Sequence, residues 1–88
     1  MATGTDTVDF GSTGSVYVTK DITTSGLTAA SYIEAFKMAE ASASNTVDAH
    51  IAAPMRLTCE YLTATTFRIH AVSDWPLRDI FNVRWVTA

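Results

Sequence analysis

An apolar residue at every second position marks three stretches in the C-terminal part of the chain: residues 55–61 (MRLTCEY), 67–72 (FRIHAV) and 80–86 (IFNVRWV). An apolar side chain at every second position is typical of a β-strand with one buried face. Because short loops separate the three stretches, the pattern predicts an antiparallel meander. Its buried face needs a second layer to cover it.

The N-terminal part is expected to supply that layer. Residues 8–10 (VDF) and 15–22 (SVYVTKDI) favour strands because they are rich in β-branched and aromatic residues. Together the patterns predict an all-β fold, a small antiparallel β-sandwich formed by one domain over residues 8–88. Residues 1–7 (MATGTDT) are small and polar, and they predict an extended N-terminal arm.

Residues Ser31 to Met38 fit two patterns. Ile33 and Phe36 fall at helical spacing, and the local Ala, Glu, Lys and Met residues favour a helix. The same segment alternates, with Tyr32, Phe36 and Met38 on one side. Local propensity slightly favours the helix. The polar residues 42–50 (SASNTVDAH) that follow predict a loop.

Matching the buried faces of the three C-terminal stretches fixes an expected register. Cys59 would lie opposite Ile69, and Ile69 opposite Val83. The outer face would then carry two rows of side chains, Glu60, Arg68 and Arg84 in one and Thr58, His70 and Asn82 in the next. Two interpretations of this ladder stay open. It contacts an acidic or hydroxyl-rich partner such as a neighbouring subunit, or it is a solvent-screened set of charges worth little to stability.

Residues 73–79 (SDWPLRD) predict a bend that holds a candidate site. Pro76 favours an extended conformation at Trp75, and Asp74 and Arg78 flank the indole. Trp75 would serve a protein interface, cap one end of the sandwich or stack on a sugar, and Trp and Arg are enriched at interfaces. The candidate ligand- or partner-binding residues are therefore His70, Asp74, Trp75 and Arg78.

Composition narrows the classes of function. Charged residues make up 17% of the 88 residues, below the roughly 25% of an average soluble domain. A net charge of -3 without a basic run argues against nucleic-acid binding. No apolar stretch approaches the roughly 20 residues that span a bilayer, and the N-terminus lacks the features of a signal peptide. We therefore expect synthesis in the cytoplasm and no membrane insertion.

Residues that carry chemistry are sparse. Cys59 is the single cysteine, which excludes an intramolecular disulfide, and no His/Cys group has zinc-ligand spacing. The sequence contains no nucleophile elbow or phosphate-binding loop. We expect no metal, no cofactor and no enzymatic activity. A chain this small without a disulfide or a metal is expected to gain stability by oligomerising.

The C-terminal third resembles the end of the H-type lectin domain, through the motifs TFRI, SDW and VRWVTA. The resemblance implies a six-stranded antiparallel β-sandwich that assembles as a trimer and whose last strand is an interior one. It also implies binding of N-acetylgalactosamine-like sugars at subunit boundaries. Val72, Asp74 and Pro76 depart from the family pattern at the turn, so the scaffold carries over better than the sugar specificity.

The whole chain also resembles small proteins encoded by tailed bacteriophages, through VDFGSTGSV, SYIEAFKMAEASASNTVDAH and FNVRWV. In those relatives the middle segment is a strand followed by a loop, which favours a strand at Ser31 to Met38. The resemblance implies a homotrimeric structural protein of the virion, a head decoration protein or a small tail or fibre component. Its partners would be other virion proteins. The alternative function is a carbohydrate-binding module for a host surface glycan.

Overall fold

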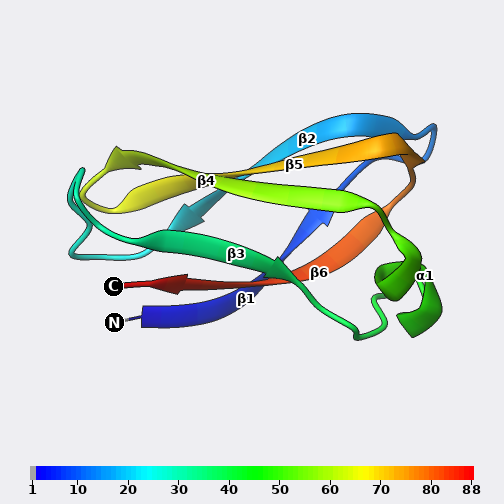
Figure 1. Ribbon diagram of the computed structural model, residues 1–88, viewed down its shortest axis with the longest axis horizontal. Coiled ribbons are helices and arrows are strands. Elements are labelled where there is room, and N and C mark those ends of the chain that lie inside the picture. Colours follow the sequence, from blue (N-terminus) through cyan, green and yellow to red (C-terminus); the bar gives the residue numbers. More distant parts are fainter. Residues whose placement is uncertain (1) are drawn as a thin grey trace.

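Six strands form two three-stranded antiparallel sheets in the computed structural model, which describes residues 2–88 (Figure 1). One sheet has the order β1 (Ala2–Asp9), β6 (Ile80–Thr87), β3 (Ile33–Lys37). The other has the order β2 (Ser15–Thr23), β5 (Thr66–Leu77), β4 (Met55–Thr63). The prediction of an all-β antiparallel fold is confirmed, and the two sheets fit a small β-sandwich.

The core lies between the sheets and follows the predicted alternation. Phe67, Ile69 and Ala71 of β5 are completely buried, and Val83 at the centre of β6 is too. Polar residues at the intervening positions of these strands keep solvent contact. The period-two pattern therefore identified the inward faces of β5 and β6 correctly.

Strand β6 does not continue the predicted meander, and this part of the prediction was wrong. β5 runs to Leu77, the chain turns at Arg78 and Asp79, and β6 enters the opposite sheet (Figure 1). Asp79 makes this turn with a positive φ of 63°, a conformation that Asp tolerates better than most residues. Both inward faces meet the same core, so alternation alone cannot tell which sheet a strand joins.

The change of sheet corrects the expected register. Cys59 does lie opposite Ile69, as predicted, but Val83 pairs with Asp6 on one side and Lys37 on the other. Strand β6 is the central strand of its sheet, hydrogen-bonded along both edges. This agrees with the expectation of an interior final strand and accounts for an apolar C-terminal segment.

Residues 2–7, which the sequence predicted to be an extended arm, belong to β1. The pairing with β6 is continuous from Ala2 opposite Thr87 to Asp9 opposite Ile80. Their backbone is extended, but it is bound within the chain's own sheet. Met1, also assigned to the arm, lies outside the described residues.

The choice of a strand over a helix at Ser31 to Met38 is confirmed for Ile33–Lys37. This segment pairs with β6, and just before it Tyr32 and Ala88 exchange two backbone hydrogen bonds of 2.8 and 2.9 Å. Pairing with a central strand outweighs the weak helical preference of the local sequence.

A short helix, α1 (Val47–Ala52), occupies part of the predicted loop 42–50. Thr46 caps it, since its hydroxyl accepts a hydrogen bond from the Ala49 amide at 3.2 Å. At the other end, the Lys37 ammonium donates to the carbonyl oxygens of Ile51 and Ala53, at 3.2 and 2.6 Å. The one ammonium group satisfies both carbonyl groups, and its positive charge complements the helix C-terminus, so a helix of six residues is stable here.

His50 of α1 is completely buried and joins the helix to the central strand. Its Nδ1 lies 2.8 Å from the Thr46 carbonyl oxygen, and its Nε2 accepts a hydrogen bond of 3.0 Å from the backbone N–H of Asn82. The ring packs edge-on against Phe81. These partners are those of a neutral imidazole that donates through Nδ1.

Polar side chains of residues 42–45 complete the edge of β6 beyond the end of β3. The Ser42 hydroxyl and the Asn45 amide donate to the Ile80 carbonyl oxygen, at 2.6 and 2.8 Å. The Ile80 amide donates to the Ser44 hydroxyl at 3.1 Å. Side chains here replace the backbone partners that a longer strand would supply.

We expect Gly4→Ala to destabilise the fold, because the β1 backbone passes directly over the indole of Trp85. A Cβ at Gly4 would lie 2.6 Å from Cε2 of that ring, too close for two carbon atoms that are not bonded to each other. Trp85 is buried and packs against Phe67, so the clash should cost about 1–3 kcal/mol of unfolding free energy. Urea denaturation measures it. Thr3→Ala, at an exposed neighbouring position, is the control, and equal effects of the two substitutions would contradict the explanation.

Candidate functional site

The outer face of the β2–β5–β4 sheet carries a ladder of paired polar side chains. Glu60 lies opposite Arg68, and Thr58 opposite His70, as the sequence predicted. Arg84 and Asn82, expected to extend these rows, lie on β6 in the other sheet. Their places are taken by Asp21 and Thr19 of β2, which pair with Arg68 and His70. The predicted ladder is therefore right for two strands and wrong for the third.

Arg68 forms a bidentate ion pair with Asp21. Nε lies 2.7 Å from Oδ1, and Nη2 lies 3.3 Å from Oδ2. The hydrogen bond from Arg68 holds the pKa of the Asp21 carboxyl below its usual range. The same pairing raises the pKa of the guanidinium. A fork-to-fork contact of this kind fixes the geometry of both side chains, even where solvent screening keeps its energy small.

His70 lies between two partners in the middle of the ladder. Its Nδ1 is 2.7 Å from the Tyr17 hydroxyl, and its Nε2 is 2.8 Å from a carboxylate oxygen of Glu60. The Tyr17 and His70 rings are nearly parallel, with centroids 5.9 Å apart. Because both ring nitrogens are engaged, His70 can reach an external group only by giving up one of these contacts.

The four binding residues predicted from the sequence do not converge on one point. His70 and Asp74 stand four positions apart on one strand, which separates their backbones by about 13 Å. Asp74 forms an ion pair with Arg56 of β4. Arg78 follows β5 in the turn, where its carbonyl oxygen accepts a hydrogen bond from Asn45. The predicted bend at residues 73–79 is thus strand to Leu77 and a tight turn after it.

Trp75 is 57% exposed, on an irregular part of β5. The register moves from Tyr17 opposite Val72 to Ser15 opposite Leu77, so several β5 residues face a single β2 residue, Val16. Val16 and Tyr17 are themselves about half exposed. This end of the sheet therefore presents three large side chains to solvent. The sequence did not indicate Val16 and Tyr17 as candidate site residues, because their exposure depends on the bulge.

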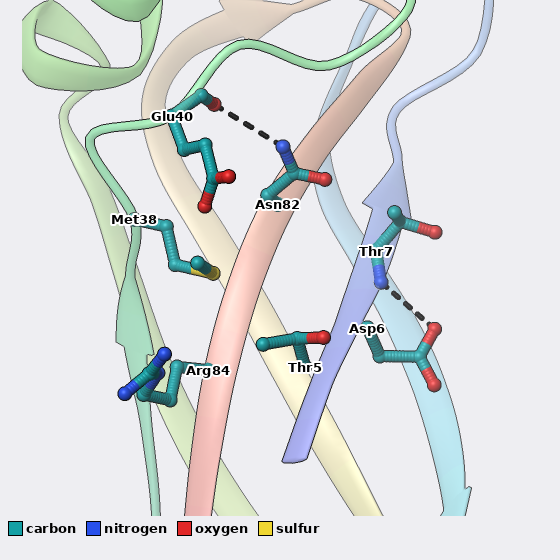
Figure 2. Close-up of a pocket in the computed structure, with 7 residues that line it drawn as sticks. All are labelled: Thr5, Asp6, Thr7, Met38, Glu40, Asn82 and Arg84. Carbon is teal, nitrogen blue, oxygen red and sulfur yellow. Dashed lines mark hydrogen bonds between the residues drawn. The ribbon is translucent and has the colours of Figure 1, made fainter.

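A depression of about 470 Å³ lies on the outer face of the other sheet. Figure 2 shows its lining residues, which come from β1, from β6 and from the segment after β3. Asn82 anchors that segment, since its side-chain Nδ2 donates to the carbonyl oxygens of Glu40 and Ala41, both at 3.1 Å. The lining residues are Thr5, Asp6, Thr7, Met38, Glu40, Asn82 and Arg84. Sequence reasoning missed this set because it forms only when β6 joins β1 and β3.

Comparison of the chain with protein-family models, with curated protein sequences and with solved structures found no match. The resemblances to H-type lectins and to phage proteins stay predictions. No helix in residues 2–88 is long and apolar enough to cross a membrane.

We expect Cys59 to react slowly in the folded protein, because burial raises the pKa of its thiol to about 11 and the charge of Glu34 adds to the rise. At pH 8 the thiolate population should be roughly a hundredfold below that of an unperturbed thiol. Ellman's reagent measures the rate, with the protein unfolded in guanidinium as the control. Glu34→Gln should speed the reaction modestly.

The same shift makes stability fall as pH rises from about 9, the ordinary value of the thiol, to about 11. The folded state keeps its proton longer than the unfolded state in that window. A native thiol as reactive as the unfolded one would contradict both expectations.

Proposed function

We propose that the protein is a non-enzymatic structural component of a tailed bacteriophage particle, a head decoration protein or a small tail or fibre component, which acts through protein–protein contacts. The observation that carries the contact role is the exposure of Trp75 together with Val16 and Tyr17. Trp and Tyr are the residues most enriched at the centres of interfaces. The assignment to a phage particle is supported by the full-length sequence resemblance.

The exposed side chains lie beside a polar ladder that is already ordered. Arg68 and Asp21 hold each other, and so do His70, Tyr17 and Glu60. A surface fixed in advance loses little side-chain entropy when a partner binds. We therefore place the contact at this end of the β2–β5–β4 sheet. Residues 2–7 are not part of the contact we propose, because β6 already binds them.

The proposal includes a homotrimer, in keeping with the small size of the chain. Light scattering of the purified protein should give three times the subunit mass of 9.5 kDa. A mass of one subunit at micromolar concentration would remove the trimer from the proposal. Mass spectrometry of purified particles of the encoding phage should find the protein in multiple copies. Its recovery only outside the particles would refute the virion role.

Trp75→Ala should weaken binding to particles grown without the gene by about thirtyfold, the loss typical of a central interface Trp. Co-sedimentation measures this loss, and circular dichroism should show an unchanged fold, because the indole is mostly in solvent. Tyr32→Ala is the matched control. Tyr32 is 56% exposed but pairs with the C-terminal residue, a full strand length away from the β5–β6 turn. Equal losses from both variants would contradict an interface centred on Trp75.

The exposed indole of Trp75, which follows Asp74 in the sequence, also fits the second candidate, a module that binds a host surface glycan. A sugar ring stacks on such an indole while a carboxylate accepts its hydroxyl protons. On this hypothesis Trp75→Ala abolishes binding to a glycan array and leaves particle binding intact. The same variant therefore separates the two functions.

A further inference from the structure

The outer face of the β1–β6–β3 sheet carries two charges of opposite sign that have no partner among residues 2–88. Across residues 2–88, the side chains of Arg84 and Glu40 form no ion pair or hydrogen bond. Both line the 470 Å³ depression. Of the six Lys and Arg residues, Lys20, Arg56 and Arg68 form ion pairs with carboxylates, and Arg84 is not among them.

The fold fixes the backbone of Glu40 and Arg84, while their charged ends are exposed to solvent. The main-chain carbonyl oxygen of Glu40 accepts a hydrogen bond from the side-chain Nδ2 of Asn82 at 3.1 Å. Arg84 stands two positions further along the same face of β6, about 7 Å from Asn82. Figure 2 shows the Met38 side chain between the Glu40 carboxylate and the Arg84 guanidinium. Met38 is itself tied to β6, because its amide donates to the Asn82 carbonyl oxygen at 3.3 Å.

The side chains around the two charges are of the kinds that line small-molecule sites. Met38 provides an apolar floor, and Phe36, the partner of Arg84 in the register, is 44% exposed beside it. Thr5 and Thr7 on β1 line the other side of the depression (Figure 2). A volume of about 470 Å³ lies within the range of ligand pockets.

We infer that this depression binds a small zwitterion with an apolar side chain, of the class of free amino acids. Its carboxylate pairs with the Arg84 guanidinium, its ammonium pairs with the Glu40 carboxylate, and its apolar part packs on Met38. A ligand with one charge would leave the other protein charge unpaired, so the site discriminates by requiring both. The inference does not rest on the proposed virion role, which concerns the other sheet.

The test is an NMR titration of the ¹⁵N-labelled protein with L-leucine, up to about 10 mM, a range that detects dissociation constants near 1 mM. Amide signals of Thr5, Met38, Glu40 and Arg84 should move together and saturate. Two analogues each remove one charge: 3-methylbutylamine lacks the carboxylate, and 4-methylpentanoate lacks the ammonium. Each should bind at least about tenfold more weakly than leucine.

Two variants test the protein side. Arg84→Gln and Glu40→Gln should each weaken leucine binding about tenfold, because each removes one of the two charges. Glu40→Gln keeps the size of the side chain, whereas Arg84→Gln also shortens it. Arg78→Gln is the matched control, since Arg78 is exposed and lies outside the depression. Absence of saturable shifts with leucine would overturn the inference. So would equal binding of either analogue, or an equal loss with Arg78→Gln.

Discussion

The structure depends on the pairing of one strand, β6, on both of its edges. Its inward side chains fill the core, its N-terminal end is completed by the polar side chains of residues 42–45, and its two edges hold β1 and β3. The first and last strands of the chain are therefore neighbours. Contacts of such long sequence separation slow folding, and the β1–β6–β3 sheet cannot form until the final residues are present.

Asn82 shows how much one residue of that strand organises. Its amide donates to buried His50, its carbonyl accepts from Met38, and its side chain holds the carbonyl oxygens of Glu40 and Ala41. Helix α1, the end of β3 and one wall of the depression are all set by these bonds. A polar network in which every group has a partner favours one arrangement, because a partial rearrangement would leave the part-buried groups of His50 and Asn82 unpaired.

The sequence predicted what local periodicity can determine. Alternation located the inward residues of β5 and β6, and the hairpin rule placed Glu60 opposite Arg68 and Cys59 opposite Ile69. It failed where the answer depends on the opposite layer. Nothing local distinguishes a β6 that continues the β4–β5 pair from a β6 that crosses over, because either choice buries the same face. The predicted Arg84 row and the Ile69–Val83 pair failed for this one reason.

The sequence missed helix α1 for a different reason and the depression for the same one. Thr46 followed by Asp48 is a recognisable helix start, but six residues are too few for periodicity to register. The lining of the depression brings together residues 5–7, 38–40 and 82–84. Their union requires the crossover of β6, so it could follow only from the topology.

The two outer faces differ in how their charges are satisfied, and this difference separates their chemistry. On the β2–β5–β4 face, Asp21, Arg68, Glu60 and His70 bind one another across the strands. In the function we propose, a partner would contact the exposed aromatic residues at the end of this face. On the β1–β6–β3 face, Met38 separates Arg84 from Glu40 (Figure 2). If the inferred ligand spans both charges, its selectivity comes from the positions of Arg84 on β6 and of Glu40 after β3.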